Sequence, residues 1–204
     1  MEAFTEVEVR VLGVLIEKAL TSPSAYPLTI NALVTGANQL QNRDPVVGYS
    51  ESEVSSALRS LERRGLVAQS PPSPGARAVR FEHHLVEQLQ WDRREQAVMA
   101  ELMLRGRQTA GELRARASRM TTLPDLQSIV SALESLKGRA TPFVEELPRE
   151  PGRSANRFRH LLGGEPVGLD AEAPAAPSLE ARVARLEADV AELKAAIAAR
   201  PSNA

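Results

Sequence analysis

The three histidines are the side chains best suited to hold a metal ion, but their spacing does not favour a metal site. His83 and His84 are adjacent, so on a β-strand their side chains would point to opposite faces. His160 stands far along the chain, no cysteine is present, and no carboxylate cluster has the spacing of metal ligands. We therefore expect no metal site and interpret the histidines as structural residues.

Sequence motifs of enzymes are missing from the chain. It contains no phosphate-binding loop, dinucleotide fingerprint, His-Glu-x-x-His motif or nucleophile elbow. Scattered serine, histidine and aspartate residues do not make a catalytic triad without the geometry that brings them together. We expect a protein that is not an enzyme and uses no cofactor.

Serine and arginine residues along one predicted helix, from about Ser50 to Gly65, are candidates for a binding function. Arginine side chains pair with guanine edges, and serine hydroxyls bond bases or phosphates. The candidates for contact with DNA on this helix are Ser52, Ser55, Ser56, Arg59 and Arg63. In the hairpin that follows, Arg77 and Arg80 would meet phosphates. A solvated helix face explains the same residues equally well.

Basic residues are concentrated in the middle of the chain, although the net charge of the whole is only −1. Residues 1–92 hold 8 Lys/Arg and 11 Asp/Glu, residues 93–163 hold 13 and 8, and residues 164–204 hold 4 and 7. The net charges are −3, +5 and −3, so the middle segment is the expected anion-facing surface. Its candidate contacts with the DNA backbone are Arg114, Arg116, Arg119, Arg153 and Arg157. Ordinary surface arginines are the competing interpretation.

A polar segment, residues 36–48, separates the second and third predicted helices of the first half. It is longer than the roughly 3–4 residues that usually join such helices, and long loops in compact domains often carry function. Asn42 and Arg43 in this loop are further candidates for contact with DNA, although its side chains could also bind a peptide. Alternatively the loop is self-capped, with Arg43 and Asp44 holding backbone groups.

The elements that would position these residues occur twice along the chain. In the first copy, Glu8 and Glu53 each stand three residues after a hydroxyl residue, which is the pattern of a capping box at a helix start. Gly65 has the position of a glycine that ends a helix. The predicted helix starts are Thr5, Thr29 and Ser50, and the predicted strands are residues 66–69 and 78–81.

The second copy begins near Arg93 and repeats this order. The pair Leu58 and Leu61 matches Leu133 and Leu136 at an offset of 75 residues, and residues 80–83 match residues 157–160 at an offset of 77. Two stretches that align in the same order indicate an internal repeat. The predicted elements are a helix starting at Thr109 with Glu112 as its capping partner, a helix over residues 125–138, and strands over residues 143–147 and 156–159.

Three helices followed by a two-stranded wing are typical of a winged helix, a variant of the helix-turn-helix. The sequence therefore predicts a mainly α fold with small β-hairpin wings, built from two tandem winged-helix domains over residues 1–92 and 93–163. A generic helical domain is the alternative.

The end of the chain has a different pattern. Residues 164–178 are rich in Gly, Pro and Ala without periodicity, which indicates a flexible linker. Within residues 179–200, the stretch from Leu179 to Ile197 places Leu at every d position and Val or Ile at every a position of a heptad, the choice that favours a parallel dimer. The dimerisation residues are Leu179, Val183, Leu186, Val190, Leu193 and Ile197. The alternative is a single helix that packs on its own domains.

The composition and the N-terminal residues indicate the cellular compartment in which we expect the protein. The chain is 43% hydrophobic but only 3% aromatic, so its cores must be built from aliphatic side chains. No apolar run approaches the roughly 20 residues of a membrane span, and the acidic N-terminus does not resemble a signal peptide. Together with the absence of cysteine, these features fit a cytoplasmic protein without membrane contact.

Several stretches resemble one family when they are taken in order. They are residues 9–18, 26–29, 31–33, 38–39, 42–45 and 100–106. Over about residues 5–163 the chain resembles the YceH-like family of bacterial proteins. The resemblance implies a tandem winged-helix fold and no established biochemical function. Gly36-Ala37 departs from the family pattern, in which a cysteine often precedes the pair that is here Asn38-Gln39.

These observations predict a dimeric DNA-binding protein that uses tandem winged helices, and transcriptional regulation is the role we expect for it. The alternative is a protein-interaction scaffold built on winged helices that does not bind DNA. The sequence pI of about 6.4 and the acidic first segment favour the alternative.

Overall fold

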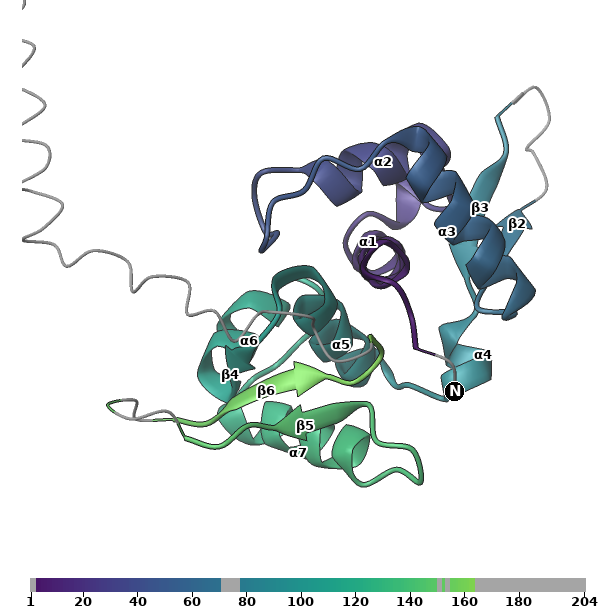
Figure 1. Ribbon diagram of the computed structural model, residues 1–204. Helices are drawn as coiled ribbons and strands as arrows, with labels where there is room; N and C mark the ends of the chain where they lie inside the picture. The colour runs from purple at the N-terminus through teal and green to yellow at the C-terminus, as the bar shows by residue number, and fades with distance from the viewer. Residues whose placement is uncertain (1–2, 71–77, 150–151, 153–154, 164–204) are drawn as a thin grey trace, which may run out of the picture. The chain divides into compact units, whose positions relative to one another are not determined.

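The computed structural model describes residues 3–70, 78–149, 152 and 155–163, which belong to one compact unit, Met1–Gly164 (Figure 1). Within these ranges the chain forms seven α-helices, one 3-10 helix and two small antiparallel sheets. A mainly helical protein with small antiparallel sheets is therefore confirmed. The predicted linker, residues 164–178, and the predicted coiled-coil helix, residues 179–200, lie outside the described residues and stay predictions.

The first half of the unit contains three α-helices and a three-stranded sheet. Each helix begins at the predicted hydroxyl residue, because Thr5, Thr29 and Ser50 accept hydrogen bonds from the backbone of the first turn. The capping boxes that join Thr5 to Glu8 and Ser50 to Glu53 are confirmed. The elements are α1 (Glu6–Thr21), the 3-10 helix η1 (Pro23–Ala25), β1 (Leu28–Thr29), α2 (Ile30–Asn38), α3 (Glu51–Arg63), β2 (Val67–Ser70) and β3 (Arg80–His83).

The second half repeats the order of the first after a short connecting helix. Asp92 caps α5, so the predicted domain boundary between residues 92 and 93 falls at the start of that helix. Thr109 and Glu112 form the predicted capping box of α6. The elements are α4 (Leu85–Leu89), α5 (Arg93–Arg105), β4 (Gln108–Thr109), α6 (Ala110–Ala117), α7 (Leu126–Lys137), β5 (Val144–Glu146) and β6 (Arg157–His160).

Each sheet has one strand more than the two-stranded hairpin that the sequence predicts. The strand orders are β1-β3-β2 and β4-β6-β5, and all pairs are antiparallel. The additional strands β1 and β4 contain two residues each and lead directly into a helix, so they are too short for an alternating pattern to reveal them. Their registers match, since Leu28 lies opposite Phe81 and Gln108 opposite Phe158.

Helix α1 is buried around most of its circumference because α2, α3 and α5 all pack against it (Figure 1). Helices α1 and α5, which are the first helix of each copy of the repeat, contact each other directly. One continuous cluster of buried apolar side chains includes residues of both halves. At Gly13 an added Cβ would lie 3.0 Å from Leu104 Cδ2, so the absence of a side chain lets the two helices approach closely.

A backbone contact also joins the beginning of the described chain to its end. The Phe4 N–H donates to the Leu162 carbonyl at 2.9 Å, and Phe4 forms an isolated parallel bridge with Gly163. The Phe4 ring is buried beneath the Arg64 guanidinium, whose carbon lies 4.3 Å from the ring centroid. The first half is therefore completed by residues that follow the last strand of the second.

Within the described ranges, no helix combines the length and the apolar character needed to cross a membrane.

A single methyl group should disturb the packing of α2 on α1. An alanine Cβ at Gly36 would lie 2.7 Å from Val14 Cγ1, which is closer than van der Waals contact allows. We expect Gly36→Ala to lower the free energy of unfolding by about 1–3 kcal/mol, measured by urea denaturation. The control is Gly48→Ala, since an added Cβ there meets no atom within 4 Å. Equal stability of the two variants would contradict this account of the α1–α2 contact.

Candidate functional site

Helix α3 presents the predicted Ser/Arg face to the outside. Its inner stripe, formed by Val54, Leu58 and Leu61, is buried, and α3 packs against α1 and α2. On the opposite side Ser55 is half-buried, and the exposed members of the predicted set are Ser52, Ser56, Arg59 and Arg63. The structure thus brings together all five residues that the sequence singled out on this helix.

The arginines on this face are held loosely. Arg59 donates from Nη1 to Ser55 Oγ at 2.8 Å and from Nη2 to Ser56 Oγ at 2.9 Å, so its guanidinium lies along its own helix. In the described part of the chain, Arg63 makes no side-chain hydrogen bond or ion pair. Neither guanidinium contacts a carboxylate, so an outside anion would not have to displace an ion pair.

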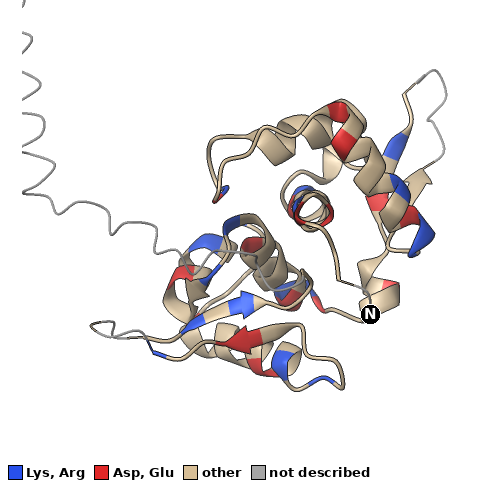
Figure 2. Cartoon of the chain, viewed as in Figure 1, with Lys and Arg blue, Asp and Glu red and all other residues tan. Residues whose placement is uncertain are grey.

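Acidic residues limit the basic part of α3 to its C-terminal half (Figure 2). Glu51 and Glu53 stand in the first turn, where the helix dipole favours negative charge. Hydrogen bonds from the Ser50 side chain and backbone lower the pKa of Glu53, so this carboxylate is held in its charged form as part of the cap. A phosphate would therefore be attracted to the end near Arg59 and Arg63.

One of the two arginines predicted to meet phosphates in the hairpin after α3 is partly engaged within the fold. Arg80 is half-buried and donates from Nη1 to the Pro27 carbonyl at 2.7 Å, so it braces β3 against the residue before β1. Arg77 lies outside the described residues.

The histidines at the ends of β3 and β6, His83 and His160, are half-buried, and ring nitrogens of both are inaccessible to solvent. Burial lowers the pKa of His83 and of His160 to about 4, so both rings are neutral near pH 7. The His83 backbone N–H donates to the Tyr26 hydroxyl at 2.6 Å, and the two rings pack at 5.9 Å between centroids. Among the described residues, no three His, Cys, Asp or Glu side chains gather in a group that could hold a metal ion.

The buried ionic cluster, which joins the two halves, consists of the buried side chains of Glu17, Arg43 and Glu101 and of the Arg119 side chain, which is 31% exposed. The Glu17 side chain on α1 is 1% exposed and receives Arg43 Nη2 at 2.6 Å and Arg119 Nη1 at 2.6 Å. Arg119, which follows α6, also donates from Nη2 to Glu101 Oε1 on α5 at 2.7 Å. Two carboxylates from the two first helices are thus bridged by one arginine, and the loop after α2 supplies the second.

The ion pairs of the buried ionic cluster shift the pKa values of Glu17 and Arg119 in the direction that favours their charged forms. Burial alone would raise the pKa of Glu17, but the hydrogen bonds and positive charges of Arg43 and Arg119 outweigh it, so the pKa is lowered. Burial likewise opposes the charge of Arg119, yet its contacts with Glu101 and Glu17 raise its pKa. Glu17 and Arg119 are therefore both charged at neutral pH.

This cluster corrects the prediction for Arg43, which is buried and cannot reach DNA. Its side chain is 0% exposed and also donates to the carbonyls of Gly36 and Asn42. The loop is thus self-capped at Arg43, the alternative that the sequence left open. Asn42 faces the second half, where its Oδ1 accepts from Arg105 Nη2 at 2.6 Å, and Arg119 has its guanidinium in two ion pairs.

Most basic side chains in the described part of the second half make hydrogen bonds or ion pairs within the fold. Arg114 donates to the Pro124 carbonyl at 2.9 Å, and Arg116 lies 3.5 Å from a Glu112 carboxylate oxygen. Arg157 is half-buried, and its Nε is buried without a hydrogen-bond partner among the described atoms. Arg153 lies outside the described residues. The net charge of +5 therefore overstates the charge available to a ligand.

Comparison with known proteins places the chain in a family. Residues 4–153 match the family described as "Protein of unknown function, DUF480". The chain belongs to this family. A UPF0502 protein of Geobacter sulfurreducens is 48% identical over 197 residues, covering 92% of this chain and 89% of that protein. A UPF0502 protein of Mesorhizobium japonicum is 44% identical over 196 residues, covering 93% and 92%.

The DUF480 match confirms the resemblance to uncharacterised bacterial proteins, although these relatives carry the name UPF0502 and not YceH. The matched range begins at the buried Phe4 and includes every element from α1 to β5. It therefore covers α3 and all four residues of the buried ionic cluster. The family description names no ligand or activity, so the function of this DUF480 chain must be argued from its own side chains.

Removal of the negative charge of Glu17 should destabilise both halves of the unit together. Glu17→Gln keeps the shape of the side chain but leaves the buried Arg43 guanidinium without a full counter-charge. We expect the free energy of unfolding to fall by about 3 kcal/mol or more in urea denaturation. The control is Glu134→Gln, which breaks an exposed ion pair with Lys137, and it should have a much smaller effect. A loss no larger than that of the control would show that the cluster does not hold the unit together.

Proposed function

We propose that each half of the unit is a winged helix and that the protein binds duplex DNA through α3 and the β2–β3 hairpin. The support is topological: in each half two helices precede a third, which leads into an antiparallel hairpin joined by a strand from before the second helix. In winged-helix proteins that bind DNA, the third helix enters the major groove and the wing contacts phosphate or the minor groove.

The observation that carries the proposal is the outer face of α3. It combines two arginines that have no carboxylate partner with serine hydroxyls, and no other element of the described chain covers it. Arginine can read guanine in the major groove, and small serine side chains let the helix approach the bases. The equivalent face of α7 is less suited, because Glu134 is exposed there and pairs with Lys137 at 3.2 Å.

DNA binding should depend on the α3 arginines more than on other exposed arginines. We expect Arg59→Ala/Arg63→Ala to weaken binding to duplex DNA at least about tenfold in fluorescence anisotropy at low salt. The affinity of the wild-type protein should fall steeply as salt is raised, because phosphate contacts release counterions.

The matched control for this experiment is Arg93→Ala/Arg94→Ala, which removes the same charge from exposed positions at the start of α5. The proposal predicts that this pair has a clearly smaller effect. It is refuted if wild-type protein does not bind genomic or random duplexes at micromolar concentration, or if the two double variants lose affinity equally.

A protein partner is the second candidate, and one observation favours it. The loop between α2 and α3 exposes two large apolar side chains, with Leu40 80% and Val46 52% accessible. Exposed apolar residues close together on a loop suit a protein contact better than a nucleic-acid contact. If DNA binding fails while a stoichiometric protein from nuclease-treated extract is retained, and Leu40→Ser/Val46→Ser releases it, the scaffold role replaces the first proposal.

We also propose that residues 179–200 form a coiled coil that makes the protein a homodimer. The basis is the heptad pattern of the sequence, since these residues lie outside the described ones. In the full chain, Leu186→Glu/Leu193→Glu should shift the mass in sedimentation equilibrium from dimer toward monomer. Ala184→Glu/Ala191→Glu adds the same charge at outward heptad positions and should leave the dimer intact. A monomeric wild-type protein, or a dimer that survives both changes, would rule out the coiled coil.

A further inference from the structure

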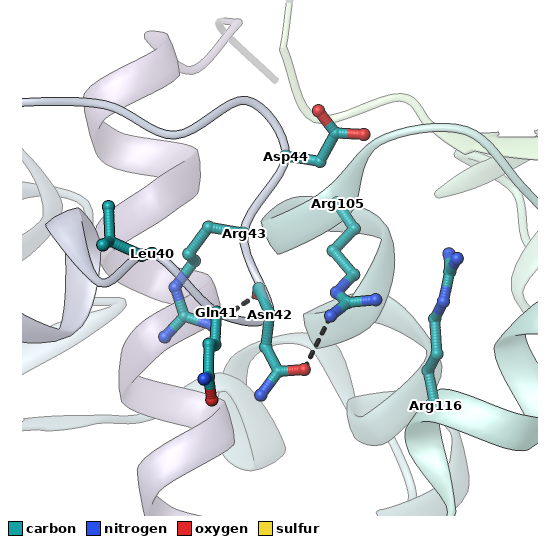
Figure 3. A pocket seen from close by; sticks show the side chains of 7 residues that line it. All are labelled: Leu40, Gln41, Asn42, Arg43, Asp44, Arg105 and Arg116. Carbon is teal, nitrogen blue, oxygen red and sulfur yellow. Dashed lines mark hydrogen bonds between the residues drawn. The ribbon is translucent and has the colours of Figure 1, made fainter. Parts of the chain in front are cut away.

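A polar hollow lies where the loop after α2 meets α5 and α6 (Figure 3). Its volume is about 480 Å³, which falls within the range of small-molecule sites, roughly 300–1,000 Å³. The loop contributes Leu40, Gln41, Asn42, Arg43 and Asp44, and the second half contributes Arg105 and Arg116. Because the Arg43 guanidinium is engaged by Glu17, the guanidinium groups of Arg105 and Arg116 are the ones left to meet a ligand, in a hollow whose lining includes one carboxylate.

Arg105 has donor capacity that the fold does not use. Its side chain is 21% exposed, and its Nη2 donates to Asn42 Oδ1 at 2.6 Å. Its Nε is buried 3.8 Å from Glu101 Oε2, too far for a hydrogen bond. Among the described residues, Nη1 of Arg105 has no acceptor. The guanidinium is thus fixed at one side of the hollow with a donor still available.

Arg116 is positioned by a buried amide. Gln108 is 1% exposed, and its side-chain Oε1 accepts a hydrogen bond from Arg116 Nη1 at 2.8 Å. The Gln108 Nε2 in turn donates to the Glu101 carbonyl on α5 at 3.1 Å, which fixes the orientation of the amide. The remaining contact of Arg116 is a 3.5 Å approach to Glu112, a partly exposed pair that an incoming anion could replace.

The loop side of the hollow is preorganised. Arg43 is anchored in the buried ionic cluster, and the Asp44 N–H donates to the Leu104 carbonyl at 2.9 Å, which ties the loop to the end of α5. Asn42 stands between these anchors with a positive φ of 60°, and its Oδ1 is turned toward Arg105 (Figure 3). A ligand would therefore not have to order this wall.

We propose that this hollow binds a small anionic molecule that carries a phosphate or carboxylate group. Arg105 and Arg116 would donate charge-assisted hydrogen bonds to its oxygens, and the side-chain amide of Asn42 would add a neutral donor. The exposed Asp44 carboxylate also lines the hollow and would repel the ligand, but the guanidinium groups of Arg105 and Arg116 outnumber it. The site is separate from the α3 face, so it does not depend on DNA binding.

Binding is tested by isothermal titration calorimetry of the full chain with inorganic phosphate and, separately, with citrate. Ionic strength is held constant with sodium chloride, so that general charge screening is the same throughout. We expect at least one probe to bind, and Arg116→Gln to weaken that binding about tenfold or more. Whichever probe binds identifies the phosphate or the carboxylate as the recognised group.

The matched control is Arg94→Gln, which removes one exposed arginine of α5 outside the hollow. It should leave the affinity for the probe unchanged. The proposal is overturned if neither probe binds wild-type protein at millimolar concentration, or if Arg116→Gln and Arg94→Gln have equal effects. It is also overturned if Arg116→Gln weakens binding to duplex DNA while free phosphate and citrate do not bind, because the hollow would then hold a backbone phosphate.

Discussion

The carboxylate of Glu17 is the group on which the arrangement of the described unit depends. An ionised carboxylate inside an apolar helix contact is costly unless hydrogen-bonded cations surround it. Its two partners come from distant parts of the chain, Arg43 in the loop after α2 and Arg119 after α6. The charge can therefore be accommodated only when α1, this loop and the second half have all reached their positions.

The ion pairs of Glu17 with Arg43 and Arg119 also determine which polar side chains are left to contact a ligand. In these ion pairs Arg43 is fully buried, and the Arg119 guanidinium contacts two carboxylates. Asn42 faces Arg105 at the edge of the hollow. The α3 face is separate from these contacts, and its two arginines are bound only weakly by serine hydroxyls or not at all. The structural arginines of the buried ionic cluster are thus distinct from the accessible arginines on α3.

The order of the elements was predictable from sequence because caps and apolar spacing are local signals. Thr5, Ser50 and Thr109 begin helices as their capping boxes predict. The ion pairs were not predictable, since they join residues as far apart as Glu17 and Arg119. A glutamate on a helix that is apolar over much of its circumference was the available signal, because a buried carboxylate requires a cation, but nothing local indicates which one.

The contact of Phe4 with the end of the second half affects the order in which parts of the protein can reach their native contacts during synthesis. The Phe4 N–H finds its acceptor only at Leu162, beyond the last strand. During synthesis the N-terminal residues emerge first, yet this partner emerges only after every element from α1 to β6. Helix α1 can form early, but the Phe4 N–H has no native acceptor until the second half has been made. The first half alone is therefore an unfinished structure.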